Sequence, residues 1–312
     1  MREAGRLSDR EHGVPGASPA VAVLRYAAFT DHGAGGNPAG VVLDARGLDP
    51  VERLAIAADV GFSETAFIEP TDTPGTYRTR YYSPRAEVAF CGHATIATAV
   101  ALAERDGPGA LTFDTLAGPV LVATQVDERG ATATLTSVPT RTRPASEDEL
   151  SAALRALRWE EADLDPRYPA HVAYAGNDHL VLALRDRDRL AALDYAYDEL
   201  DALMAERSWT TLQLVHAHGP ALFAARDPFP PGGVVEDPAT GAAAAAFGGY
   251  LRALGLVELP ATVTLLQGED MGRPSRLTVD ITADDDRIRV SGTAAAIEAD
   301  PSPVTVTRNA AP

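Results

Sequence analysis

Glu64 is the first residue whose surroundings point to acid–base chemistry. The segment 62–70 alternates between polar and apolar residues, which predicts a strand. Residues two apart in a strand share a face, so Glu64 shares its face with three apolar side chains. These are Phe62, Ala66 and Ile68. We expect a carboxyl group in such company to have a raised pKa, which suits a general acid or base. The alternative is a glutamate that reaches water at the end of a strand.

His93 is the second candidate, because it stands where a strand turns into a helix. An apolar run ends in Cys91-Gly92-His93, and an Ala-rich segment without charges follows. This pattern predicts a helix that opens near Ala94 or Thr95 and is buried, since nearly every side of it is small or apolar. Its first turn has free N–H groups, and its dipole favours an anion there. The position suits a carboxylate substrate beside His93, and a histidine that only caps the helix is the alternative.

Asp237 is the third candidate, in a segment that repeats this arrangement. Residues 234–241 are again a short apolar run and a polar turn, and the Ala-rich segment 242–251 follows. Asp237 before Pro238 is typical of an N-cap followed by the first helical residue, and capping alone would explain this aspartate. We interpret the two copies as a weak internal repeat, one in each half. Two buried helices whose N-termini face each other would enclose one site between two lobes.

Short strands dominate the rest of the chain. They are expected at residues 21–29, 41–43, 77–82, 110–115, 119–125, 131–136, 170–174, 179–184, 212–216, 221–225, 261–267, 275–282, 287–290 and 294–297. The glycine-rich stretch 33–40 predicts a tight turn, and the alternative is that its backbone at Asn37 lines the site. Many strands with one central helix in each half predict an α+β fold with antiparallel sheets, not a doubly wound parallel sheet.

The chain divides into a tail and two lobes. Residues 1–20 are charged and rich in glycine and proline, so we expect a disordered tail and no signal peptide. The N-terminal lobe is expected at 21–138 and the C-terminal lobe at 147–293, with a polar linker at 139–148 that contains two prolines. We expect the last strand, about 294–308, to return to the first lobe.

Composition limits the classes of function. A chain of 312 residues with 46% hydrophobic residues suits two globular domains. Its net charge of −17 at pH 7 would repel nucleic acid. The single cysteine excludes an internal disulfide and any zinc cluster of several cysteines, and it fits a reducing cytoplasm. The Ala-rich segment is too short and too polar to span a bilayer. We therefore expect a cytoplasmic protein without a nucleic-acid or membrane partner.

The sequence resembles the PhzF family of phenazine-biosynthesis-like isomerases. The matching pieces occur in family order, and together their spacing is specific although each piece alone is weak. They are residues 36–40 (Gly-Asn-Pro-Ala-Gly), 62–67 (Phe-Ser-Glu-Thr-Ala-Phe), 82–84 (Tyr-Ser-Pro), 87–95 with its Cys-Gly-His-Ala-Thr, and 236–241 (Glu-Asp-Pro-Ala-Thr-Gly). The resemblance runs from about residue 24 to near the end of the chain.

The resemblance implies the diaminopimelate-epimerase-like fold, in which two similar lobes each wrap an antiparallel, barrel-like sheet around a central helix. It also implies a homodimer, and neither a cofactor nor a metal. By the match, Glu64 carries a proton between carbons of a carboxylated, unsaturated ring, and His93 and Asp237 assist it. The residues expected to bind the substrate are Asn37, Ser63, Gly92, Thr240 and Gly241.

One position departs from the family pattern. A serine often follows the last glycine of the Asp-Pro-Ala-Thr-Gly segment in the family, and this chain has Ala242 there. A hydroxyl group is therefore missing at the expected start of the second helix. The departure puts the substrate in question, though not the chemistry.

The residues and the resemblance together predict a cofactor-independent isomerase of specialised metabolism. Ionised Glu64 would remove an acidic C–H proton from a small unsaturated carboxylic acid and return it to another carbon, so that a double bond moves. His93 and the two helix ends would stabilise the intermediate charge. A racemase with two thiols is excluded, since Cys91 is the single cysteine. Two alternatives stay open: a protein that binds a small carboxylate without turnover, and a hydrolase or lyase with the same acid–base set.

Overall fold

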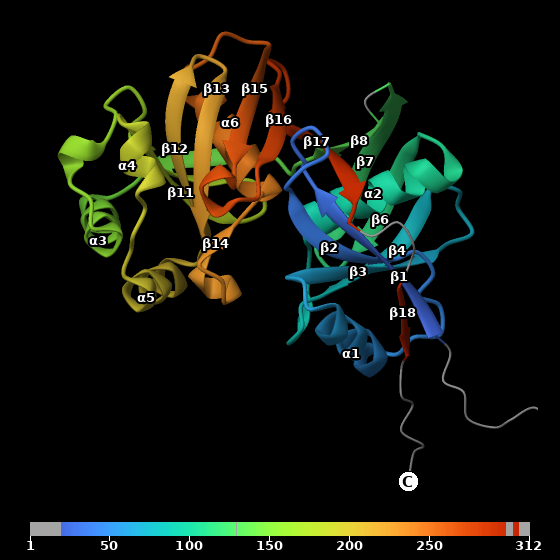
Figure 1. The fold of residues 1–312 in the computed structure, drawn as a ribbon. Coiled ribbons are helices and arrows are strands. Elements are labelled where there is room, and N and C mark those ends of the chain that lie inside the picture. Colours follow the sequence, from blue (N-terminus) through green and yellow to red (C-terminus); the bar gives the residue numbers. More distant parts are fainter. Residues whose placement is uncertain (1–19, 129, 298–301, 306–312) are drawn as a thin grey trace, which may run out of the picture.

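The computed structural model describes residues 20–297 and 302–305, with a gap at residue 129. The expected tail, residues 1–20, lies outside this part except for Ala20, where the first strand begins. Two lobes of similar build lie side by side (Figure 1). In the described part of the chain, no helix is both long enough and apolar enough to cross a membrane.

Eight strands close into a barrel in the N-terminal lobe, because each strand is hydrogen-bonded to the next and the last one returns to the first. In order around the barrel they are β1 (Ala20–Ala28), β2 (Asn37–Val42), β3 (Glu64–Pro70), β4 (Thr76–Tyr82), β6 (Ala110–Thr115), β7 (Gly118–Asp127), β8 (Gly130–Thr136) and β17 (Arg289–Ala296). The stretch 37–40, predicted as part of a turn, belongs to β2 and pairs with β1.

The C-terminal lobe has a similar sheet, and β17 belongs to both lobes. In order across this sheet the strands are β9 (Arg141–Pro144), β10 (His171–Tyr174), β11 (Asp178–Leu184), β12 (Trp209–Gly219), β13 (Leu222–Pro228), β15 (Ala261–Gln267), β16 (Ser275–Ile281) and β17. β9 lies within the segment predicted as a linker, residues 139–148, yet it pairs with β10. An edge strand tolerates proline, so the two prolines of this segment do not prevent the pairing.

The two lobes repeat one order of strands and helices. Helices connect four strand pairs: α1 (Pro50–Val60) between β2 and β3, α2 (Gly92–Asp106) between β4 and β6, α4 (Arg187–Ala191) with α5 (Tyr197–Arg207) between β11 and β12, and α6 (Gly241–Ala253) between β13 and β15. These four pairs run parallel, because a helical crossover returns the chain to the same end of the sheet. The other pairs between the strands of the two lobes are antiparallel, so the fold is α+β with mainly antiparallel, barrel-like sheets.

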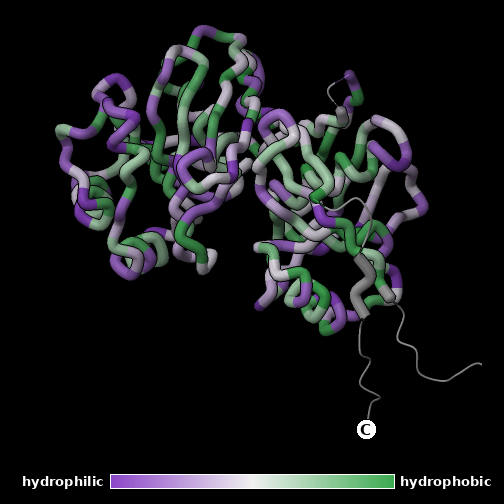
Figure 2. The backbone as a smooth tube through the Cα atoms, in the orientation of Figure 1, coloured by the Kyte–Doolittle hydropathy of each residue, from purple (hydrophilic) through white to green (hydrophobic). Residues whose placement is uncertain are grey.

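Each lobe is wrapped around one central helix, α2 in the first and α6 in the second (Figure 1). In α2 every residue from His93 to Ala103 is buried. Small residues let the sheet approach closely: a Cβ atom at Gly248 of α6 would lie only 2.7 Å from Cγ1 of Val279. Figure 2 shows hydrophobic residues along these interior segments and hydrophilic ones at the loops. The prediction of two buried, Ala-rich helices agrees with this packing.

Helices also cover the outer faces of the sheets, α1 on the first lobe and α3 (Glu147–Leu157) with α5 on the second. α1 and α3 each begin with a capping box. Asp49 pairs with Glu52 at the start of α1, and Ser146 pairs with Glu149 at the start of α3. Such boxes satisfy the N–H groups that a helix start leaves free.

β17 joins the two lobes. Its first residues pair with β16, its last residues, 294–296, pair with β1, and β8 lies along its other edge. The sequence predicted two separate strands here, at 287–290 and 294–297, and the structure has one continuous strand. The short β18 (Ser302–Thr305) also pairs with β1, so these residues run along the first lobe, while residues 298–301 and 306–308 of the predicted last strand lie outside the described part of the chain.

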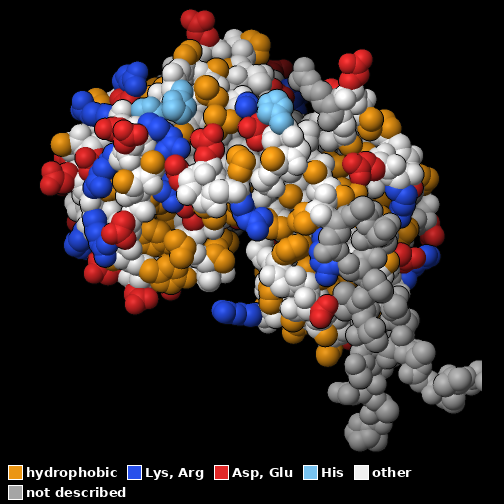
Figure 3. Space-filling model, in the orientation of Figure 1, with side chains coloured by type: hydrophobic (Ala, Val, Ile, Leu, Met, Phe, Trp, Pro, Cys, Tyr) orange, Lys and Arg blue, Asp and Glu red, His pale blue; other side chains and the backbone are white. Residues whose placement is uncertain are grey.

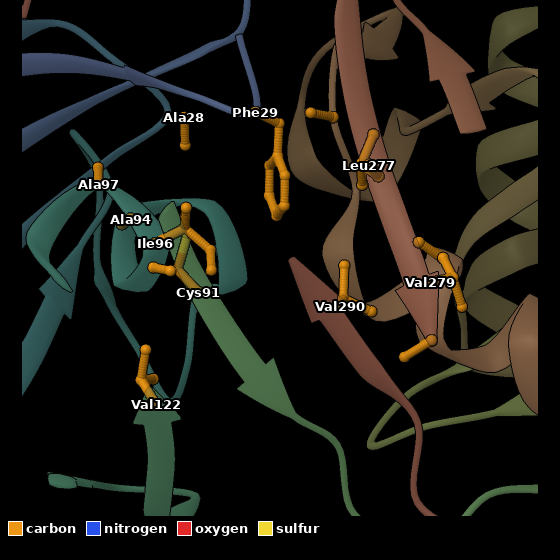
Figure 4. Close-up of a cluster of buried hydrophobic side chains, with 14 of the residues drawn as sticks. Ala28, Phe29, Cys91, Ala94, Ile96, Ala97, Val122, Leu277, Val279 and Val290 are labelled. Atoms are coloured by element: carbon orange, nitrogen blue, oxygen red, sulfur yellow. The ribbon is translucent and has the colours of Figure 1, made fainter. Parts of the chain in front are cut away.

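The ring of Phe29 fills the junction between the lobes, with Ile96 and Cys91 on one side and Leu277 and Val290 on the other (Figure 4). Its φ of 60° is a left-handed conformation that residues other than glycine seldom adopt. Backbone hydrogen bonds to both neighbouring strands hold it there. One aromatic side chain from the end of β1 thus packs against both lobes and fixes how they meet.

Candidate active site

The two central helices begin next to each other at the boundary between the lobes. A Cβ atom at Gly92, the first residue of α2, would lie 4.0 Å from the Cα of Gly241, the first residue of α6. Figure 3 shows the surface hollowed between the lobes, on the side where Figure 1 places β3 and β14 (Glu236–Asp237). The meeting of two helix N-termini creates one shared site from two halves of the chain.

Both helix starts differ from the sequence predictions. α2 begins at Gly92, two to three residues before the predicted opening at Ala94 or Thr95. α6 begins at Gly241 with Thr240 as its N-cap, so Asp237 is not the N-cap that Pro238 suggested. The reason is that Asp237 pairs with β13 in extended conformation, and the chain then needs three residues to turn into the helix.

Neither of these helices has a capping box or a capping hydrogen bond from its N-cap side chain. The N-cap residues, Cys91 and Thr240, make no side-chain hydrogen bond to the first turn. α1 and α3, by contrast, carry full capping boxes. The N–H groups and the positive dipole ends of α2 and α6 are therefore available to an anion at the junction.

Glu64 and His93 form the centre of the first half of the site. Nε2 of His93 lies 3.4 Å from Oε2 of Glu64, and the side chains are 8% and 16% exposed, respectively. Oγ of Ser63 is also 3.4 Å from Nε2 of His93, and Sγ of Cys91 is 3.4 Å from Nδ1. The imidazole can therefore exchange a proton or a hydrogen bond with the carboxylate, while both remain largely shielded from water.

The strand that carries Glu64 follows the predicted alternation only in part. Ala66 and Ile68 point toward α2 and belong to the inner core, as the same-face prediction requires. Phe62 instead packs with the outer cluster beneath α1, because β3 begins only at Glu64 and the alternation does not extend to residues before it. Glu64 thus lies at the start of the strand, where the inner face opens to the junction.

Asp237 is the centre of the second half, and it is held by side chains from both lobes. Nδ2 of Asn37 donates to Oδ1 of Asp237 at 2.7 Å, and the hydroxyl of Thr240 donates to Oδ2 at 2.6 Å. Burial raises the pKa of Asp237, and the charge of Glu64 raises it further, while His93 and the two hydrogen bonds oppose this rise. The three predicted catalytic side chains therefore interact electrostatically across the junction.

Two residues of this network were missed by sequence reasoning. Gln267, at the end of β15, donates to the backbone oxygen of Asp237 at 2.8 Å and accepts from the backbone N–H of Thr240 at 3.2 Å. Asp227, in β13, pairs with Asp237 in the sheet and is fully buried. Burial, followed by the charge of Asp237, raises the pKa of Asp227 well above its usual value. Neither residue has a local motif, and only the fold brings them to the site.

The five residues predicted to bind substrate all lie in or beside the junction. Asn37 and Ser63 hold Asp237 and His93 through the contacts given above, Thr240 holds Asp237, and Gly92 and Gly241 open the two helices. The side-chain donors of Asn37 and Thr240 are engaged by Asp237, so the donors left for an anion are the backbone N–H groups at the two helix starts. The arrangement can hold a carboxylate next to an acid–base pair.

Comparison with known proteins identifies the same family as the sequence motifs. The family described as phenazine biosynthesis-like protein matches residues 26–300. An uncharacterized isomerase of Mesorhizobium japonicum is 30% identical over 276 residues, which cover 83% of this chain and 90% of that protein. The trans-2,3-dihydro-3-hydroxyanthranilate isomerase of Pseudomonas fluorescens is 28% identical, over 77% of this chain and 83% of its own.

A solved structure agrees with the fold. The crystal structure of a PhzF-family phenazine biosynthesis protein from Bacillus anthracis superposes with a TM-score of 0.79 at 27% identity, over 90% of this chain and 98% of that one. The two-lobed arrangement around α2 and α6 is therefore shared with an experimentally determined structure.

Proposed function

The chain belongs to the phenazine biosynthesis-like protein family and is an isomerase, and we propose that it moves a proton and a double bond within a small unsaturated carboxylic acid without a cofactor. The observation that carries this proposal is the Glu64–His93 pair, whose atoms lie 3.4 Å apart where two uncapped helix N-termini meet. The helix ends would bind the substrate carboxylate, and the pair would handle the proton.

Glu64 is the proton carrier in this proposal. As the carboxylate, it removes a proton from a carbon next to an unsaturated or carbonyl group, and the electron pair of that C–H bond spreads over the conjugated system. The protonated Glu64, which keeps 16% of its side chain exposed and can exchange its acidic proton with water, then delivers a proton to another carbon, so that one C–H bond breaks, one forms and the double bond shifts. No oxidant, reductant or water is consumed.

His93 and Asp237 assist from the two sides of the junction. His93 contacts Glu64 directly, so it can steady the carboxylate and donate to the developing negative charge. Asp237 interacts electrostatically with His93, and Asn37 and Thr240 fix both oxygens of Asp237. The backbone N–H groups at Gly92 and Gly241 would stabilise the substrate carboxylate through both steps.

The substrate class we propose is a cyclic, unsaturated acid of specialised metabolism. The relative in Pseudomonas fluorescens is named for trans-2,3-dihydro-3-hydroxyanthranilate, a ring that carries a carboxylate, an amino group and a hydroxyl group. Ala242, the second residue of α6, offers a methyl group where the family often has a serine. We therefore propose a related ring acid that needs one hydrogen bond less at this point. A cytoplasmic homodimer is the proposed working form.

Proton exchange tests this function. The full chain is incubated in D2O with a panel of dihydroaromatic and pyrroline-type carboxylic acids, and carbon-bound deuterium is followed by NMR while product mass is measured. The proposal predicts deuterium at a ring carbon and, in ordinary water, a product of unchanged mass. Binding without exchange would instead indicate a carboxylate-binding protein, and a product of changed mass would indicate a hydrolase or lyase.

A further inference from the structure

Three different metal-ligating side chains meet in the first half of the site. Glu64, Cys91 and His93 each offer one ligand atom, and these atoms all lie within 4.8 Å of one another. They come from the start of β3 and the start of α2, two elements fixed by the barrel. A carboxylate, a thiolate and an imidazole together are a ligand set that suits zinc and not magnesium or calcium, which prefer oxygen alone.

Two of the distances between these atoms are close to those between neighbouring ligands in a tetrahedron around zinc. Zinc lies about 2.0–2.1 Å from an imidazole nitrogen, about 2.3 Å from a thiolate and about 2.0–2.2 Å from a carboxylate oxygen. Neighbouring corners of such a tetrahedron are then about 3.3 Å apart for nitrogen and oxygen, and about 3.6 Å for nitrogen and sulfur. Nε2 of His93 lies 3.4 Å from Oε2 of Glu64 and 3.7 Å from Sγ of Cys91. Sγ of Cys91 also lies 3.4 Å from Nδ1, so the thiol must rotate about its Cα–Cβ bond to share an ion with Nε2 and Glu64.

We propose that Glu64, Cys91 and His93 bind one zinc ion, which acts as a reversible inhibitor of this protein. Zinc sites with three protein ligands keep a fourth position for water or another small ligand. Glu64 keeps 16% of its side chain exposed, so an ion can reach the group from the junction. The bound ion would coordinate the carboxylate of Glu64, which could then no longer take up the substrate proton. The binding rests on geometry alone, and the inhibition rests on the proposed function.

Binding is tested without any substrate. Zinc chloride is titrated into the metal-free full chain by calorimetry, and cobalt(II) is added in a parallel experiment because a thiolate ligand produces a charge-transfer band in the near ultraviolet. The expected result is one zinc ion per chain and a cobalt–thiolate band. Even the outer partners of metal ligands are worth about 10–100-fold in affinity, so Cys91→Ala should weaken zinc at least about 100-fold and abolish the band.

Two controls make this result specific. His216 and His218 lie on β12 with ring centroids 5.1 Å apart, and such a pair can bind zinc adventitiously. The double variant His216→Ala/His218→Ala should keep the tight zinc site and the cobalt band. Cys91→Ser, which conserves volume, replaces Cys91→Ala if thermal unfolding shows that the alanine variant does not fold.

The outcomes separate the metal site from the proposed reaction. The site is overturned if zinc binding is lost in the His216/His218 variant and kept in the Cys91 variant, or if cobalt gives no thiolate band. If zinc binds as predicted while no acid of the panel exchanges a proton, the metal site stands and the proposed function fails. If an acid does exchange, zinc should stop the exchange in the wild type, whereas the exchange rate of Cys91→Ala is compared only with its own zinc-free rate and should not change with zinc; exchange that continues in the wild type with zinc bound would overturn the inhibition.

Discussion

Nε2 of His93 lies 3.4 Å from Oε2 of Glu64, although β4 and the short β5 (Glu87–Val88) separate their elements in the chain. The contact exists because β3 is one strand of the barrel wall and α2 is the helix that fills the barrel. Both residues stand at the end of the barrel that faces the second lobe, where α6 begins. A pair that is close in space and largely shielded from water can pass a proton directly between its members.

Asn37 should matter for catalysis, because it links the lobes at Asp237. Its Nδ2 lies 2.7 Å from Oδ1 of Asp237, and this bond lowers the pKa of that carboxyl group. In Asn37→Ala the pKa of Asp237 should rise further, so the acid limb of the pH–rate profile should move to higher pH. A hydrogen bond to a charged group is worth about 1.5–3 kcal/mol, so kcat/KM should fall at least about tenfold. An unchanged acid limb would contradict the role given to Asp237.

Asp227 should make the protein less stable at high pH than an asparagine would. Its pKa in the folded state is raised well above the unfolded value, so the folded protein binds the extra proton. Stability linked to this group is therefore fully present below the unfolded pKa and is lost as the pH rises through the folded pKa. Asp227→Asn removes this loss, and the free energy of unfolding should exceed the wild-type value more at pH 8 than at pH 5. Urea unfolding measures it, with exposed Asp284→Asn as the control; an equal gain at both pH values would refute the assignment.

His179 should make the protein sensitive to mild acid. It is fully buried, and burial lowers its pKa to about 4. Because the unfolded chain binds a proton near pH 6.5, stability is full above that pH and falls toward the folded pKa. Between pH 7.5 and 5.5 this single group should cost on the order of 1 kcal/mol. His179→Gln should reduce the acid loss by that amount in urea unfolding, whereas exposed His218→Gln should not; parallel loss in wild type and His179→Gln would contradict this reading.

Gly292 should tolerate no side chain, because Phe29 occupies the space. A Cβ atom there would lie 2.3 Å from Cδ1 of the Phe29 ring, whereas one at Gly219 would meet nothing within 4 Å. Overpacking of this kind costs about 1–3 kcal/mol, so Gly292→Ala should lower the free energy of unfolding by that amount. Gly219→Ala is the matched control, and equal midpoints for the two variants would show that Phe29 does not fix the junction.

The sequence was informative where a pattern is local. Alternation placed β3 and Glu64, and the all-round apolar character of the two Ala-rich segments predicted their burial. The strand inside the predicted linker was missed and the N-cap at Asp237 was wrong for one reason: strand pairing, of β9 with β10 and of β14 with β13, overrode the local preference. Gln267 and Asp227 could not be found at all, because their contacts with Thr240 and Asp237 depend on the order of strands in the sheet.

Hydrogen–deuterium exchange in Glu64→Gln tests the central claim most directly. Glutamine keeps the size of the side chain but cannot take up a proton, so exchange at the substrate carbon should be at least about 10² slower than in the wild type. Glu87→Gln, in which the exposed partner of Arg80 loses its charge, should exchange at the wild-type rate. Near wild-type exchange in Glu64→Gln would show that another group carries the proton and would contradict this account.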